Sequence, residues 1–354
     1  MKCSVLRVPT ASPDDVSGLQ DYIDRSILDP SKVIAVMGKT EGNGCVNDYT
    51  RGYATSSLKS FYEKYNGKAA NEISFVMSGG TEGILSPHFT IVSRDTEKYE
   101  VTSNKKALSI GIAKTPIIQA EDLGRKNQVM AVAQAVEEAM GDANIHELSD
   151  IHFVQVKCPL LTSSKIEKAK IDGKVIVTDD TYKSMGYSRG ASALGVAVAL
   201  REISREELLE SDICHVWEKY SEVASTSAGS ELDYCEVIVF GNSAQAEGPL
   251  FIDHVVMKDA IDGSVVKEMI DKYPEDRIIQ VLAKAEADPS GYTRNRRHTM
   301  LNDSDINHTR HARAVVGGVL ASLSGDPMIY VSGGAEHQGP SGGGPVAIIF
   351  SSGE

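Results

Sequence analysis

The sequence lacks any apolar run of the about 18 residues that a membrane-spanning helix needs. Its first residues, MKCSVLRVPTASPDD, also lack the apolar stretch of a signal peptide. Positive charge is scarce, because 36 Lys and Arg stand against 49 Asp and Glu, which gives a formal net charge of −13. Nucleic acids and anionic membranes are bound through clustered Lys and Arg. We therefore expect a cytoplasmic protein that binds neither nucleic acid nor a membrane.

Motifs for thiolate, metal and nucleotide chemistry are missing as well. The five cysteines include no CxxC pair, and an odd count without such spacing indicates reduced thiols. The nine histidines show no HExxH spacing, which disfavours a metal-dependent hydrolase. Gly38-Lys39-Thr40 lacks the earlier glycine of a phosphate-binding loop. No organic cofactor is expected.

A pattern that occurs three times is what the sequence does contain. A chain of 354 residues is too long for one ordinary core. Short runs rich in β-branched residues, at 32–39, 151–157 and 277–284, each read as a buried strand that ends in a lysine. The three lysines are Lys39, Lys157 and Lys284.

A second predicted strand in each copy ends in a related turn, Ser-(Gly/Ala)-Gly-x-Glu. Its aligned serines are Ser78, Ser227 and Ser332, and the second copy is degenerate.

Between the lysine and the serine, each copy contains a predicted helix with an arginine near its start. These arginines are Arg51, Arg189 and Arg313. Arg310 is an alternative to Arg313, because Thr309-Arg310 also resembles Thr50-Arg51. The run of small residues after Arg313 matches the run after Arg189 and favours Arg313.

Polar stretches at 93–106 and 241–248 separate the copies. We therefore predict an α/β protein of three homologous repeat units, spanning residues 1–104, 108–247 and 251–354. Each unit is expected to be a β-sheet backed by helices, with pseudo-threefold symmetry around a central active site. Further helices are predicted at 128–140, 205–210 and 264–272.

A central site of this kind suits a small, flat ring with repeated carbonyl and N–H groups. An arginine guanidinium is a planar donor fork that fits a ring carbonyl. A Ser-Gly-Gly turn offers a hydroxyl and backbone N–H groups, which are the parts of an oxyanion hole. Serine with lysine is a known nucleophile and base for acyl transfer, provided that the lysine is neutral. Burial and nearby cations both lower the pKa of a lysine.

The sequence also distinguishes the three lysines. Glu41 and Glu286 stand two residues after the lysines of the first and third copies, and residues two apart on a strand share a face. These carboxylates are expected to stabilise charged lysines. Lys157 is followed by Cys-Pro and has no such partner. We therefore predict that Lys157 is the easiest to keep neutral and forms the reactive pair with Ser227.

The tail at 333–345 is dense in glycine. It is either an irregular loop that closes the last strand or a cage of backbone carbonyls for a hard cation, which takes oxygen ligands.

Several long motifs resemble the cyanuric acid hydrolase and barbiturase family. They are VMGKTEGNGCVNDYTR at 36–51, FVMSGGTEG at 75–83, FVQVKCPLLT at 153–162, GYSRGASALG at 186–195, the segment 297–315 and the tail. The resemblance covers essentially the whole chain. It implies hydrolysis of the s-triazine ring of cyanuric acid to carboxybiuret, which loses carbon dioxide to give biuret. It also implies a homotetramer.

The resemblance further implies roles for single residues, with Ser227 as nucleophile and Lys157 as base. The implied substrate-binding set is Lys39, Arg51, Ser78, Gly79, Arg189, Ala228, Lys284, Arg313, Ser332 and Gly333. A structural Mg or Ca ion is implied at Glu286, Ala335, Gln338, Gly339, Pro340 and Gly343.

Two alternatives remain at this point. Barbiturases share the framework and open the barbituric acid ring, although the detailed motifs favour cyanuric acid. A binding protein for a small ring would do no chemistry, but it would favour three equivalent charged lysines over an unpaired Lys157.

Overall fold

The computed structural model describes residues 1–97 and 105–352 of the chain. The predicted linker at 93–106 falls partly outside these residues, at 98–104.

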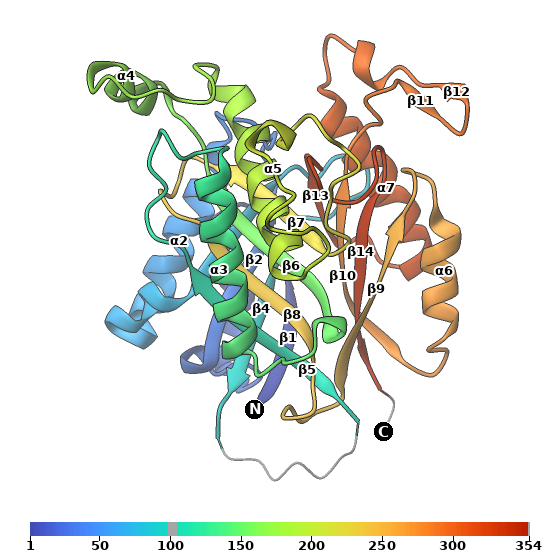
Figure 1. The fold of residues 1–354 in the computed structure, drawn as a ribbon. Coiled ribbons are helices and arrows are strands. Elements are labelled where there is room, and N and C mark those ends of the chain that lie inside the picture. The colour runs from blue at the N-terminus through green and yellow to red at the C-terminus, as the bar shows by residue number, and fades with distance from the viewer. Residues whose placement is uncertain (98–104, 353–354) are drawn as a thin grey trace.

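Three four-stranded sheets form the framework, with orders β1-β4-β2-β3, β5-β8-β6-β7 and β9-β14-β10-β13 (Figure 1). In the first sheet the strands are β1 (Lys2–Pro9), β2 (Val33–Thr40), β3 (Ser74–Gly79) and β4 (His88–Asp95). In the second they are β5 (Ala107–Lys114), β6 (Ile151–Pro159), β7 (Ala224–Gly229) and β8 (Glu236–Ser243). In the third they are β9 (Leu250–Met257), β10 (Arg277–Ala285), β13 (Tyr330–Gly333) and β14 (Gly344–Ser351).

The three sheets agree in pairing as well as in order. In each, the first two pairings in that order are antiparallel, and the last strand runs parallel to its neighbour. The central strand of each sheet has a register shift near its start, as between Val33 and Ala35 in β2. The predicted strands that end in a lysine or a serine turn are therefore confirmed.

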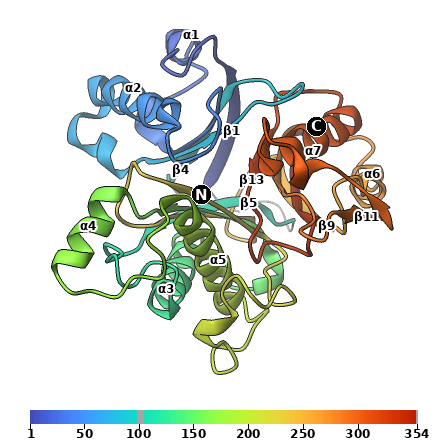
Figure 2. The same ribbon diagram turned by 90° about the horizontal axis from the view of Figure 1, so that it is seen from above.

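Helices cover the outer faces of the sheets, and Figure 2 shows the three groups of sheet and helices around a common centre. The helices are α1 (Ser17–Asp24), α2 (Tyr49–Asn66), α3 (Lys126–Asp142), α4 (Ser163–Ile171), α5 (Thr181–Ala199), α6 (Gly263–Asp271) and α7 (His308–Ser324). Short 3₁₀ turns lie at Pro30–Lys32, Gly67–Glu72, Leu148–Asp150, Glu210–Asp212 and Met300–Asn302, and β11 (Tyr292–Thr293) pairs with β12 (Arg296–Arg297). Within the described ranges, no helix has both the length and the apolar character needed to cross a membrane.

The inner faces of all three sheets share one apolar core. Met37, Phe153, Phe240, Leu282 and Ile349 belong to it and are buried. The opposite face of each sheet packs against helices in a core of its own. Burial on both faces explains why the strands read as nearly continuous apolar runs instead of alternating ones.

Two of the predicted helices are confirmed and one is wrong. Segments 128–140 and 264–272 lie within α3 and at α6. Segment 205–210 forms turns followed by a 3₁₀ turn. Six residues are too few for a stable helix without tertiary support. Here Lys219 Nζ and Lys126 Nζ bind the carbonyls of Glu207 and Leu208, which a helix would bond internally.

Arg189 does not lie near the start of its helix, as the sequence pattern predicted. α5 begins at Thr181, because the Asp180 side chain caps it by accepting from Lys183 N. The arginine therefore projects from the middle of α5. All five cysteines are free, in agreement with the prediction of reduced thiols.

Candidate active site

The parallel strands place one lysine opposite one serine in each sheet. Lys39 is in register with Ser78, Lys157 with Ser227, and Lys284 with Ser332. Each pair lies at the carboxyl end of its strands, where the loops of a sheet with parallel strands bind ligands.

One central pocket joins these three strand ends. Its lining combines the three predicted serines and the three predicted arginines with Met185 and small residues, whereas Lys39, Lys157 and Lys284 are not among the lining residues. The lining residues are Gly44, Arg51, Ser78, Gly79, Met185, Arg189, Ser227, Ala228, Arg313, Ser332 and Gly333. The structure thus brings together residues that lie as far apart in the sequence as 51 and 333.

Arg313, and not Arg310, is the third arginine of the pocket. Its side chain is only 4% exposed, whereas that of Arg310 is 37% exposed and lies outside the pocket lining. Both arginines nevertheless contact Glu82.

The three serine hydroxyls differ in their hydrogen bonds. Ser78 Oγ accepts from Lys39 Nζ at 3.2 Å, and Ser332 Oγ accepts from Lys284 Nζ at 3.1 Å. Ser227 Oγ is buried and has no hydrogen-bond partner in the part of the chain that the structure describes. A buried hydroxyl without a partner is costly, and it is available to a ligand in the pocket.

The three lysines are all buried, and burial is the largest cause that lowers the pKa of each. The pKa values of Lys39 and Lys284 lie well below the usual value, and the neighbouring guanidinium groups of Arg313 and Arg189 add to that effect. For Lys157 burial is opposed by Glu231, so its pKa is lowered less strongly.

Lys157 pairs with the carboxylate of Glu231, although the sequence pattern predicted no carboxylate partner for it. Its Nζ lies 2.8 Å from Glu231 Oε1 and donates to Met77 O at 2.8 Å. Burial raises the pKa of Glu231, but Lys157 and Arg51 outweigh it and hold that pKa below its usual value. The prediction that Lys157 is unpaired is therefore wrong, and so is the prediction that it is the easiest of the three lysines to keep neutral, since the pKa values of Lys39 and Lys284 are lowered further.

The predicted carboxylate partners of Lys39 and Lys284 are also wrong, because their strands end before the two glutamates. β2 ends at Thr40 and β10 ends at Ala285, so the alternation of side chains stops one residue before each glutamate. Glu41 is exposed. Glu286 instead contacts His308 Nδ1 at 2.9 Å and accepts from Thr309 Oγ1 at 2.8 Å.

The glutamates that end the serine motifs are site residues that sequence reasoning missed. Glu82 binds Arg313 through both oxygens, at 2.7 and 2.8 Å. Glu336 binds Arg189 in the same way, at 2.6 and 2.7 Å. In both cases the glutamate follows a strand of one sheet and the arginine comes from a helix of another unit. The sequence contained a pattern that could have identified these glutamates, because each stands four residues after the aligned serine.

In the second copy, the corresponding glutamate does not bind an arginine of another unit. Glu231 pairs with Lys157 of its own sheet, while Arg51 donates to the carbonyls of Ala228 and Cys45 at 2.8 and 2.7 Å. Arg51 Nε is buried without a hydrogen-bond partner among the described residues, and lies 3.7 Å from Asp48 Oδ2. The unit with the free serine is therefore also the unit with a differently placed carboxylate.

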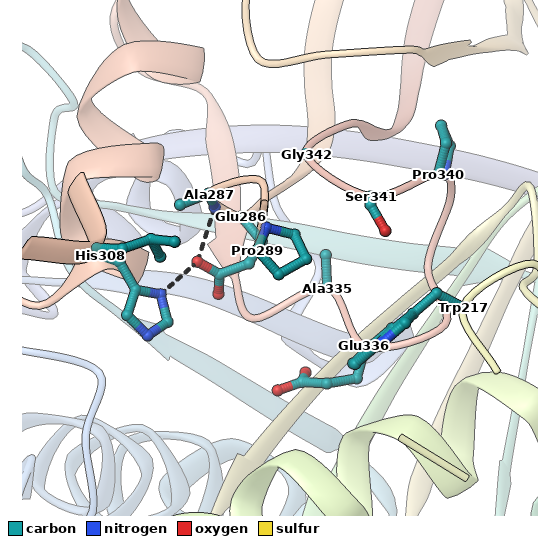
Figure 3. A pocket seen from close by; sticks show the side chains of 11 residues that line it. Trp217, Glu286, Ala287, Pro289, His308, Ala335, Glu336, Pro340, Ser341 and Gly342 are labelled. Carbon is teal, nitrogen blue, oxygen red and sulfur yellow. Dashed lines mark hydrogen bonds and ion pairs between the residues drawn. The ribbon is translucent and has the colours of Figure 1, made fainter. Parts of the chain in front are cut away.

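The residues predicted to hold a cation are only partly gathered in one pocket, since Gln338, Gly339 and Gly343 are not among its lining residues. Glu286, Ala335 and Pro340 line a second pocket of about 280 Å³, which also contains Trp217 and Glu336 (Figure 3). The carboxylate of Glu286 lies on one side of this pocket and the glycine-dense tail on the other (Figure 3).

Two backbone carbonyls of the tail already accept hydrogen bonds, Ala335 O from Gln338 N at 3.1 Å and Pro340 O from Gly343 N at 2.9 Å. The side chain of Gln338 is fully committed, because it accepts from Thr226 N at 2.6 Å and donates to Gly334 O at 3.1 Å. Gln338 can therefore offer only its backbone carbonyl. A Cβ at Gly343 would lie 2.0 Å from Met257 O, so the tight turn requires glycine there. One carboxylate with several backbone carbonyls is an oxygen donor set that fits Mg²⁺ or Ca²⁺.

Comparison with known proteins agrees with this geometry. The family model of the amidohydrolase ring-opening proteins matches residues 4–351. A cyanuric acid amidohydrolase of Rhizobium leguminosarum bv. trifolii (strain WSM1325) is 54% identical over 350 residues, which covers 99% of this chain and 98% of that protein. A cyanuric acid amidohydrolase of Pseudomonas sp. (strain ADP) is 51% identical, and 98% of each chain is covered.

Solved structures show the same likeness. A cyanuric acid hydrolase described as an evolutionary innovation by structural concatenation superposes with a TM-score of 0.95 at 49% identity, over 99% of both chains. The crystal structure of the enzyme from A. caulinodans superposes with a TM-score of 0.94 at 50% identity, over 100% of this chain and 99% of that one. The chain belongs to the family of ring-opening amidohydrolases.

Proposed function

We propose that this chain hydrolyses cyanuric acid, opening its s-triazine ring to carboxybiuret, which then loses carbon dioxide to give biuret. The observation that carries this proposal is the convergence on one pocket of three arginines and three serines, each serine in register with a buried lysine. Three sheets of equal strand order support a chain of three repeat units, 1–104, 108–247 and 251–354, related by a pseudo-threefold axis. A ring with three equivalent carbonyl and N–H groups matches that symmetry.

The arginines and the turns hold the ring in this proposal. Arg51, Arg189 and Arg313 direct N–H groups at ring carbonyls, and each is kept in place by protein oxygens on its other side. Ser78-Gly79 and Ser332-Gly333 offer hydroxyl and backbone donors, and Lys39 and Lys284 orient these two hydroxyls by donating to them.

Ser227 is the nucleophile of the proposed reaction. Its hydroxyl lines the pocket and has no hydrogen-bond partner in the described chain, so no existing bond must be broken before attack. Lys157, opposite it in register, takes the hydroxyl proton as Oγ attacks a ring carbonyl. The C–N bond then breaks, and the leaving ring nitrogen takes the proton from Lys157.

Hydrolysis of the acyl-enzyme completes the cycle. Water attacks the ester carbonyl while Lys157 accepts its proton, and Ser227 Oγ leaves and is reprotonated. The negative oxygen that forms in both steps is stabilised by nearby donors of the pocket. Burial lowers the pKa of Lys157 and favours the neutral amine that accepts a proton, while Glu231 raises this pKa and favours the protonated amine that donates one.

The test is loss of substrate by the purified protein, with cyanuric acid and barbituric acid assayed side by side. Turnover of cyanuric acid with formation of biuret supports the proposal. Turnover of barbituric acid alone would assign the sister activity, and turnover of neither would indicate a binding protein.

Serine variants test the choice of nucleophile. Ser227→Ala is expected to bind the ring without converting it, whereas Ser78→Ala and Ser332→Ala weaken binding and keep measurable turnover. A Ser227→Ala protein that retains its rate, with either other variant inactive, would move the nucleophile to another pair.

The proposal includes a structural Mg²⁺ or Ca²⁺ ion held by Glu286 and by backbone carbonyls of Ala335, Gln338, Gly339, Pro340 and Gly343. Such an ion would fasten the tail that contains Glu336, and thereby Arg189. The resemblance to the family also implies a homotetramer.

A further inference from the structure

A cluster of three metal-ligating side chains lies away from the central pocket, between the second and third sheets. His152 comes from β6, and Asp253 and His254 come from the edge strand β9. The two Nδ1 atoms are 2.9 Å apart, and His152 Nδ1 lies 3.8 Å from Asp253 Oδ1. One potential ligand atom from each residue lies within 4.8 Å of the other two. In the described ranges no other group of three or more His, Cys, Asp or Glu meets that condition.

Both imidazoles are suited to bind a cation at neutral pH. Burial lowers the pKa of His152, and it lowers the pKa of His254 to about 4, with the neighbouring His152 adding to the effect. A neutral imidazole has a lone pair on one ring nitrogen, which is the form that ligates metals. The two facing Nδ1 atoms have two possible arrangements. Either one donates a hydrogen bond to the other, or both direct their lone pairs at one bound ion.

The surroundings favour positive charge. Asp253 supplies a carboxylate within the cluster, and Asp150 and Glu222 lie close enough to act electrostatically on His152 and His254 respectively. Two lysines oppose it: Lys106 Nζ lies 2.6 Å from Asp150 Oδ2, and Lys272 Nζ is 3.9 Å from Asp253 Oδ2. The side chain of Lys272 is 60% exposed, so solvent screens its charge.

Hydrogen bonds within the protein fix the orientation of the Asp253 carboxylate. Asp253 Oδ2 accepts from Tyr273 OH at 3.0 Å, and Oδ1 accepts from His254 N at 2.8 Å. Hydrogen bonds of this kind orient the carboxylate ligands of metal sites.

We propose that His152, Asp253 and His254 bind one zinc-type divalent cation that fastens β6 to β9. Two imidazole nitrogens and one carboxylate oxygen, with water in the fourth position, make a tetrahedral set that suits Zn²⁺ or Co²⁺. With bonds of about 2.0–2.1 Å, the two nitrogens of such a site lie roughly 3.3 Å apart, so the rings need separate by only a few tenths of an ångström.

This site is independent of the proposed reaction and of the oxygen cage at the tail. His152 precedes Lys157 by five residues on β6, which places it roughly 16 Å along the strand from the reacting end. Its nitrogen donors select borderline ions, whereas Mg²⁺ and Ca²⁺ prefer oxygen alone. The bound ion therefore stabilises the junction of two sheets and takes no part in ring opening.

The experiment is a calorimetric titration of ZnCl₂ into the full chain, freed of any affinity tag and of metal. We expect one equivalent to bind, unaffected by excess Mg²⁺ and Ca²⁺, and Co²⁺ to give the visible absorption of a four-coordinate site. His152→Gln and His254→Gln should each weaken binding by at least about tenfold, the lower range for a damaged metal site. His146→Gln is the matched control, because His146 is exposed and contacts only Gln245 among the hydrogen bonds found for its ring.

The absence of saturable zinc binding would overturn the proposal, and so would binding that both variants retain in full. Circular dichroism establishes whether the variants fold. If they do not, zinc X-ray absorption of the unaltered protein decides the matter: two imidazole ligands support the site, and none refutes it.

Discussion

Replacement of Glu231 by glutamine tests whether this carboxylate sets the charge of Lys157. At the 2.8 Å that separates Lys157 Nζ from Glu231 Oε1, two unit charges attract by about 6 kcal/mol at an effective dielectric constant of 20. The proposed base must be neutral. Glu231 stabilises the protonated amine and so raises the pKa of Lys157, which burial lowers. Without that charge the pKa falls, and kcat should persist to lower pH.

The size of the effect follows from the same pair. If only a quarter of the attraction is lost, about 1.5 kcal/mol, the acid limb of the pH profile moves to a proton concentration that is about tenfold higher. The assay is kcat for ring opening at saturating substrate as a function of pH. Asp233→Asn is the matched control, because Asp233 lies two residues away, is 62% exposed and pairs with Lys165 instead.

A second group near Lys157 also titrates in this pH range and would affect both pH profiles. Burial raises the pKa of Glu236 to about 7, and Glu236 is in register with Lys157 on the neighbouring strand. Both profiles are therefore also measured in a Glu236→Gln background. An acid limb that stays in place, or that moves to higher pH, would refute the reasoning.

Three further predictions concern the arginines and the tail. Gly334→Ala should lower kcat/KM by at least about tenfold in steady-state assays, since its Cβ would lie 2.5 Å from Arg189 Nε and its φ is +78°; an unchanged value would show that Arg189 is not critically placed. Arg313→Ala should cost at least about 100-fold in kcat/KM, as for other lost transition-state donors, while Arg310→Ala stays within about threefold; equal losses would contradict the assignment. Adding Mg²⁺ or Ca²⁺ to chelated protein should raise the thermal midpoint by a few degrees, and Glu286→Gln should abolish this gain; an equal gain in the variant would place the ion elsewhere.

The framework could be predicted from sequence because its signal is local. Strands buried on both faces leave runs such as 33–37 in which nearly every residue is apolar. The lysine and serine at the strand ends recur in the same order, and parallel register brings them together. The three units repeat one pattern, so each copy supports the interpretation of the other two.

The pairing of charges could not be predicted in the same way, because it is decided between units. The assignment of Glu41 and Glu286 assumed that the strands continue past the lysines, but both end first. Glu336 finds its partner 147 residues away, on α5. Such contacts depend on how three sheets pack around their shared core, and no spacing within one unit encodes that arrangement.

The asymmetry of the second unit also follows from the three units sharing one chain. In a trimer of identical chains, every lysine would have the same carboxylate neighbour and every serine the same hydrogen bond. Here Glu82 and Glu336 bind arginines of other units, whereas Glu231 binds Lys157 and leaves Ser227 Oγ unpartnered. A single chain can keep two pairs for holding a nearly symmetric ring and alter the third for attack. Since a ring with three equivalent carbonyls presents the same groups to each unit, the difference between binding and reaction must come from the protein, and the pairing of Glu231 with Lys157 is one such difference.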